Sequence, residues 1–285
     1  MKDLLMRISY TSSAGRFIEI LDILDEMNVE YEVQEFCNNY DYSAVRNIIV
    51  HLGDGGFSDI ALSCHYDIIP GSCGANDNGS SCVILLKFIE TYIASGCTKN
   101  IDIIFFDKEE TGFIGSKKYV ENVLDTDEKK NMFTLINLDV CGCGDDIVVV
   151  DELRDNNKYE DLLFSDDAID SYDLCFASSF PPSDVVNFSK NKIDNVSISV
   201  FPAEDAYYLS SVPIEDKDFY AIKNHDDNAY QAKYNHKRKI HERFGFYFLE
   251  IFKYMHNAEF DDIAYINFDI MEKIKKYLSE TIIGG

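Results

Sequence analysis

The 285-residue sequence has no long hydrophobic run. No stretch approaches the ~18 uninterrupted apolar residues of a membrane-spanning helix, so we expect no transmembrane segment and no membrane partner. The apolar run near the N-terminus is too short for the core of a secretory signal peptide, which favours a cytoplasmic location. Internal repeats and low-complexity linkers are also lacking. We therefore expect one domain over residues 1–285.

Basic side chains are scarce. The chain has 26 Lys and Arg against 51 Asp and Glu, a formal net charge of −25 at pH 7. Such a chain repels the phosphates of nucleic acids and of anionic lipids, which argues against both as partners. Because 46% of its residues are hydrophobic, the chain is not a disordered acidic tail either.

The sequence has eight cysteines but no secretion signal to accompany them. In a chain of this length we expect free thiols rather than a disulfide framework. The one short pair, Cys141-Gly-Cys143, lacks a second pair at the spacing of a zinc ribbon, so it is not by itself a metal site.

Short apolar segments alternate with segments of helical periodicity along most of the chain. This alternation indicates an α/β fold in which helices cover both faces of a sheet. The predicted strands are 31–36, 47–52, 59–65, 101–106, 135–138, 147–150 and 196–201, and the predicted helices are 17–27, 83–93, 117–124, 240–255 and 270–278.

The segment from Asp151 to Asp173 departs from this alternation because it is rich in Asp and Ser. It is compatible with a lid, a partner surface or a solvated loop, and we expect the solvated loop.

Acidic and imidazole side chains follow several predicted strands at the point where each ends. Because ligands bind beyond the carboxyl ends of strands in α/β sheets, we expect these side chains to converge. Nitrogen and oxygen ligands of this mix suit zinc better than manganese or cobalt. The residues at these strand exits are His65, Asp67, Asp77, Glu109, Glu110 and Asp139.

The surrounding sequence resembles the di-zinc aminopeptidases of metallopeptidase family 28, which are related to the glutaminyl cyclases. The matching segments are His65-Tyr66-Asp67, Gly74-Ala75-Asn76-Asp77-Asn78-Gly79-Ser80, Phe106 to Ser116 with its Glu-Glu-x-Gly-x-x-Gly-Ser run, Asn137-Leu138-Asp139 and a later His225. The resemblance implies a three-layer α/β/α sandwich with a mixed, mostly parallel central sheet, as in zinc exopeptidases.

Carried over residue by residue, the resemblance implies two zinc ions per chain. It also implies a cis peptide after Asp77. Glu109 would be the general base toward a water between the ions, and Asp67 would orient the ring of His65. The implied ligands are Asp77 as the bridge, His65 and Asp139 for one ion, and Glu110 and His225 for the other.

The sequence departs from the family pattern in three places. The bridging loop ends Ser80-Ser81 instead of Ser-Gly, and Val185 replaces a histidine after Asp184, which leaves Asp184 a supporting role. His225 is followed by Asp226-Asp227 instead of Thr-Pro-x-Asp, so Asp227 is the candidate to orient it. His256 lies near the end of a predicted helix, where we expect its positively charged form to stabilise the helix C-terminus.

The function implied is that of a metallo-aminopeptidase, a hydrolase acting on peptides that have a free N-terminus. Three alternatives remain open: a glutaminyl-cyclase-like acyltransferase with one zinc, a non-catalytic recognition domain of the same fold, and an amidase or deacylase for a small molecule. The sequence does not indicate an oligomeric state.

Overall fold

The computed structural model describes residues 1–38, 42–155, 157–177, 182–210, 249–256 and 259–284. Its centre is a sheet of eight strands in the order β1-β2-β4-β3-β5-β8-β6-β7. The strands are β1 (Glu32–Cys37), β2 (Ala44–Leu52), β3 (Ile60–His65), β4 (Ile101–Phe106), β5 (Thr134–Leu138), β6 (Asp146–Glu152), β7 (Leu174–Phe176) and β8 (Asp194–Phe201).

The middle of the sheet is parallel. Strand β3 pairs in parallel with β4 and β5, β5 pairs in parallel with β8, and β6 with β7. The pairs β1–β2, β2–β4 and β6–β8 are antiparallel. Every residue of β3, β4, β5 and β8 is buried, as expected for central strands that are covered on both faces. The predicted α/β class with a mixed, mostly parallel sheet is confirmed.

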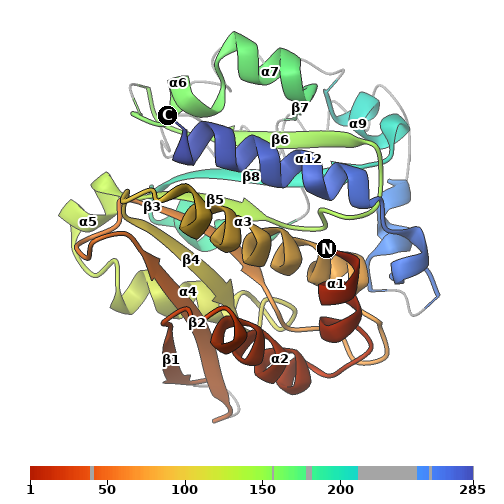
Figure 1. Ribbon diagram of the computed structural model, residues 1–285, viewed down its shortest axis with the longest axis horizontal. Coiled ribbons are helices and arrows are strands. Elements are labelled where there is room, and N and C mark those ends of the chain that lie inside the picture. Colours follow the sequence, from red (N-terminus) through yellow and green to blue (C-terminus); the bar gives the residue numbers. More distant parts are fainter. Residues whose placement is uncertain (39–41, 156, 178–181, 211–248, 257–258, 285) are drawn as a thin grey trace.

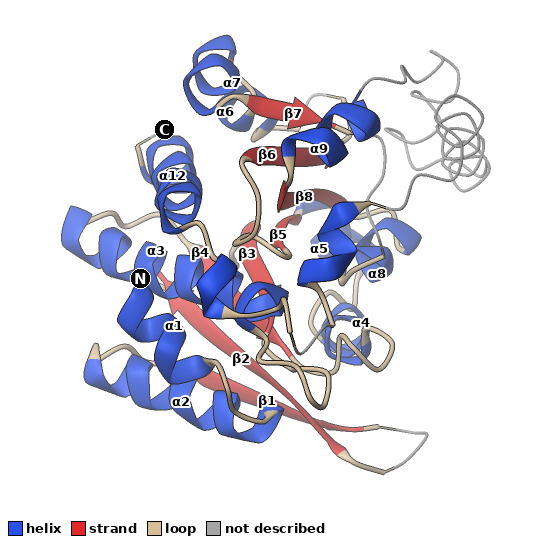
Figure 2. Ribbon diagram, turned by 90° about the vertical axis from the view of Figure 1, so that its right-hand side faces the viewer, coloured by secondary structure: helices blue, strands red, loops and turns tan. Residues whose placement is uncertain are grey.

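Helices lie on both faces of the sheet (Figures 1 and 2). One face is covered by α1 (Lys2–Ile8), α2 (Ser13–Glu26), α3 (Ser81–Ser95) and α12 (Phe268–Leu278), and the other by α4 (Ile114–Asn122), α5 (Asp127–Met132) and α8 (Val185–Lys190). Each face has its own apolar core. The smaller core centres on the packed rings of Tyr119, Phe133 and Phe188.

The helices expected over 17–27, 83–93, 117–124 and 270–278 and the buried strands were predicted correctly. The short elements α1, α5, α8, β7 and α9 (Ala203–Ser210) were not, because each is too short to show a period. The predicted free thiols are confirmed, since every cysteine is free. Among the described residues, no helix combines the length and the apolar character needed to cross a bilayer.

The expectation of a solvated loop over Asp151 to Asp173 was wrong. This segment forms α6 (Glu160–Leu163) and α7 (Asp166–Tyr172). Four of its acidic residues lie in first turns, where they stabilise the helix N-terminus, while Leu163 and Tyr172 are buried; the four are Glu160, Asp161, Asp166 and Asp167. The ring of Tyr172 lies 5.2 Å from that of Tyr277 on α12.

The predicted helix over 240–255 is wrong in its described part, and residues 240–248 lie outside the described residues. The segment Glu250–Tyr254 forms a 3₁₀ helix, η2, which ends at an extended Met255. The carboxylate of Asp205 accepts hydrogen bonds from the amides of Glu250 (2.9 Å) and Ile251 (2.8 Å), so a new turn begins there.

Candidate metal centre

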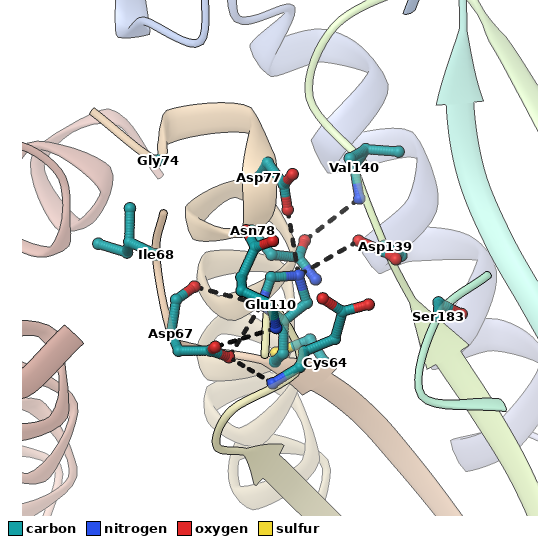
Figure 3. Close-up of polar contacts among 12 residues, drawn as sticks. Cys64, Asp67, Ile68, Gly74, Asp77, Asn78, Glu110, Asp139, Val140 and Ser183 are labelled. Carbon is teal, nitrogen blue, oxygen red and sulfur yellow. Dashed lines mark hydrogen bonds and ion pairs between the residues drawn. The ribbon is translucent and has the colours of Figure 1, made fainter. Parts of the chain in front are cut away.

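Three connections that follow the carboxyl ends of the adjacent parallel strands β3, β4 and β5 bring polar side chains together. His65 is the last residue of β3, Glu109 and Glu110 follow β4, and Asp139 follows β5. Asp77 lies in η1 (Ala75–Ser80), the irregular turn that leads into α3. Figure 3 shows Asp67, Asp77 and Asp139 facing a shared space from separate segments.

Asp77 lies between two sets of candidate ligands. On one side, His65 Nε2 is 3.1 Å from Asp77 Oδ1 and 3.5 Å from Asp139 Oδ1. On the other side, His256 Nε2 is 3.0 Å from both Asp77 Oδ2 and Glu110 Oε2. In each set, the ligand atoms all lie within 4.8 Å of one another. The two oxygens of one carboxylate therefore face two separate groups.

His256 was not anticipated as a member of this cluster. The sequence interpretation placed His225 in this role, but His225 lies outside the described residues, as does Asp227. The available signal was that each histidine precedes an acidic pair, Asp226-Asp227 or Asp261-Asp262. The pattern of residue types did not separate the two candidates.

Asp67 links two of the ligand-bearing segments. Its Oδ1 accepts the amide of Glu109 at 3.0 Å and its Oδ2 accepts the amide of Glu110 at 3.1 Å. Nδ1 of His65 lies 3.2 Å from the main-chain oxygen of Asp67 and 3.4 Å from its Oδ1. With Nδ1 turned toward Asp67, Nε2 of His65 is left to face Asp77 and Asp139.

Asp261 fixes the loop that carries Asp77. Its Oδ1 accepts the amides of Asn76 (2.6 Å) and Asp77 (3.2 Å), and its Oδ2 accepts the hydroxyl of Ser72 (2.5 Å). Asp261 is fully buried. Sequence reasoning missed this residue too, because the contact spans more than 180 residues of chain.

Asn78 connects the Asp77 loop to the Asp139 loop. Its side chain donates to Leu138 O at 3.0 Å and accepts from the amide of Val140 at 3.2 Å. Val140 has a φ of 51°, a region that β-branched residues rarely adopt. The peptide between Asp77 and Asn78 is cis, as the family resemblance implied.

The close packing of carboxylates around two imidazoles shifts the pKa values of the cluster. Burial opposes the charged form of His65, but Glu109, Asp139, Asp67 and Asp77 raise its pKa well above the ordinary value. Hydrogen bonds to Asp77 and Glu110 raise the pKa of His256 to about 10. Burial opposes ionisation of Asp77, yet contacts with His256 and His65 lower its pKa.

The other acids of the cluster are harder to ionise. Burial, together with repulsion from Asp139, Asp184 and Asp77, raises the pKa of Glu109 to about 10. Burial raises the pKa values of Glu110 and Asp139 as well.

The donor set fits divalent cations. Within the described part of the chain, Glu110 Oε1 is a buried oxygen that accepts no hydrogen bond, and the buried Asp77 Oδ2 and Asp139 Oδ1 face imidazole nitrogens at 3.0 and 3.5 Å. Buried carboxylate oxygens rarely have so few donors, so these oxygens point to a cationic partner. Imidazole nitrogen and carboxylate oxygen are ligands that zinc accepts.

Comparison with known proteins agrees with this geometry. The model of "Peptidase family M28" matches residues 47–245. Aminopeptidase YwaD of Bacillus subtilis is 35% identical over 83 residues, which cover 29% of this chain and 18% of that protein. A vacuolar membrane protease of Kluyveromyces lactis is 22% identical over 231 residues, covering 74% of this chain and 24% of its own. The chain thus spans less than a quarter of either relative.

Solved structures share the fold. BSAP, a zinc aminopeptidase from Bacillus subtilis, matches with a TM-score of 0.59 at 20% identity, covering 85% of this chain and 50% of its own. The glutaminyl cyclase of an Acidobacteriales bacterium matches with a TM-score of 0.62 at 15% identity, covering 99% of this chain and 92% of its own.

Proposed function

The chain belongs to peptidase family M28, and from this membership we propose that it is a zinc-dependent aminopeptidase that holds two ions per chain. The observation that carries the proposal is Asp77, whose two carboxylate oxygens each face a separate group of ligand atoms. A carboxylate in this position serves as a bridge between two cations. YwaD and BSAP, both named as aminopeptidases, support the peptidase reading.

The two ligand sets divide around Asp77. His65 and Asp139 would hold one ion together with Asp77, and Glu110 and His256 would hold the other with the same carboxylate. When bound, a zinc pair supplies Lewis-acid chemistry: it lowers the pKa of water and polarises a carbonyl group. The buried oxygens of Asp77, Glu110 and Asp139 would become ligands in this arrangement, which accounts for their burial.

Glu109 belongs to neither of the two ligand sets around Asp77, which leaves it available for proton transfer. It is the neighbour of Glu110, it is buried, and its amide is fixed by Asp67. As a general base, Glu109 accepts a proton from the attacking water and passes it to the leaving amine. Burial and nearby carboxylates raise the pKa of Glu109, and cations bound to those carboxylates would oppose the repulsion.

A second candidate is a glutaminyl-cyclase-like acyltransferase. The observation that favours it is chain length. This chain covers 92% of the Acidobacteriales cyclase but only 50% of BSAP. A one-zinc enzyme would leave one of the two ligand sets without an ion. The convergence of both sets on Asp77 is why we prefer the aminopeptidase.

A panel of fluorogenic amides tests the function directly. We expect hydrolysis of aminoacyl amides with a free α-amino group, loss of that activity with a chelator, and recovery on addition of zinc. The matched control is the same amide with an acetylated amino group, which should resist cleavage. Peptides with an N-terminal glutamine should be cleaved rather than cyclised.

Three results would contradict the proposal. Cleavage that survives the chelator removes the metal from the mechanism. Cleavage restricted to the acetylated amides makes the protein an amidase or deacylase. Cyclisation of N-terminal glutamine without hydrolysis of any amide establishes the cyclase instead.

A further inference from the structure

Arg16, on α2, is the largest of the fully buried side chains. Its guanidinium donates three hydrogen bonds within the described chain, and every acceptor is a main-chain carbonyl. These bonds join Nε to Ile8 O at 2.7 Å, Nη1 to Tyr66 O at 3.3 Å, and Nη2 to Gly74 O at 2.6 Å. Long charged side chains are rarely buried to this extent unless their charge has a use.

The three carbonyls belong to separate segments of the chain. Ile8 is the last residue of α1. Tyr66 stands between His65 and Asp67, and Gly74 immediately precedes the loop of Asp77. One planar group therefore connects an N-terminal helix to the two segments that carry the ligands His65 and Asp77.

The packing around Gly74 shows how closely the guanidinium fits. Gly74 has a φ of 66°, and a Cβ on this residue would lie 2.6 Å from Nη2 of Arg16. Its carbonyl also accepts the amide of Gly79 at 3.0 Å, so a single oxygen closes the Asp77 loop and receives the arginine. A larger residue at position 74 would separate the two.

The charge of Arg16 acts on the same loop. Burial lowers the pKa of Arg16, and the nearby acids Asp261 and Asp77 oppose that shift. Arg16 thus places a buried positive charge near two acids of the site, Asp77 and Asp261. It also lies outside the residues that match the family model.

We propose that Arg16 is a positioning residue that raises the affinity of the site for zinc. It does so by fixing the segment of His65 and the segment of Asp77 relative to each other. The inference rests on the proposed function, because it requires that these residues bind metal. Without the guanidinium, the carbonyls of Ile8, Tyr66 and Gly74 each lose one hydrogen bond, and the segments that carry His65 and Asp77 lose their common contact. Groups that support metal ligands in this indirect way typically contribute 10–100-fold to affinity.

The test compares three variants by competition for zinc with a chromogenic chelator, below the unfolding temperature of each metal-free protein. Arg16→Met should weaken zinc binding by about 10–100-fold. Arg16→Lys keeps the positive charge but replaces the planar guanidinium with an ammonium group, so we expect a smaller loss of zinc affinity than in Arg16→Met. The control is Arg7→Met, which removes exposed ion pairs between α1 and α2 with Glu19 and Glu26 and should leave zinc affinity unchanged.

A second readout separates positioning from general stability. The rise in Tm caused by zinc should be smaller in Arg16→Met than in the wild type, since weaker binding stabilises less at the same zinc concentration. In Arg7→Met this rise should equal that of the wild type even if the metal-free Tm falls.

Equal zinc affinity in the wild type and both Arg16 variants overturns the inference, and so does a loss that Arg7→Met reproduces. Failure of Arg16→Lys to fold with excess zinc also overturns it, because Arg16 would then serve folding alone. A wild type that binds no zinc refutes the proposed function instead, and the two failures are thereby distinguished.

Discussion

Glu109→Gln should lower kcat for a free aminoacyl amide by about 10²–10⁴-fold while zinc binding stays unchanged. The amide of glutamine has nearly the size and shape of the carboxyl group but accepts no proton at neutral pH. Because Glu109 is assigned no ligand role, its replacement removes the base and leaves His65, Asp77, Glu110, Asp139 and His256 in place. Steady-state kinetics and the zinc content of the purified variant give the two numbers needed.

The matched control for this variant is Glu121→Gln. Glu121 lies on α4, is about half exposed and pairs with Lys118, so the same change there should leave both kcat and zinc content at wild-type values. Wild-type turnover in Glu109→Gln would remove Glu109 from the mechanism. Loss of zinc from Glu109→Gln would reassign it as a ligand.

His256→Ala should abolish turnover and reduce the zinc content from two ions per chain to one. His256 would be the nitrogen ligand of its set, and without it Asp77 and Glu110 are the carboxylates that remain there among the described residues. The set formed by His65, Asp77 and Asp139 is untouched by the substitution. Elemental analysis after gentle dialysis measures the change.

His225→Ala is the control that decides between the two interpretations of the last ligand. We expect this variant to keep two zinc ions and its activity. Loss of one ion in His225→Ala, with two retained in His256→Ala, would instead support the ligand set implied by the sequence resemblance.

The sequence placed together those candidate ligands that lie at the end of a buried strand or shortly after it. His65, Glu110 and Asp139 belong to this group, because the carboxyl ends of neighbouring parallel strands meet at one edge of the sheet. Asp77 could be found because it lies in a specific run of glycine and asparagine between a strand and a helix.

The remainder depends on contacts between distant parts of the chain. His256 has a φ of 53° after a short 3₁₀ helix, and the apolar spacing before it resembles that of an ordinary helix. Asp261 and Arg16 reach the same loop from opposite ends of the chain, by hydrogen bonds to main-chain atoms. Hydrogen bonds to main-chain atoms leave no pattern of residue types, so local periodicity could not reveal either one.

An anomalous difference map, recorded at the zinc absorption edge from crystals of the zinc-loaded protein, tests the central claim most directly. The account predicts two peaks, one within about 2.0–2.2 Å of His65 Nε2 and the other at the same range from His256 Nε2, with an Asp77 oxygen as ligand to both. A single peak, or peaks that do not share Asp77, would contradict it.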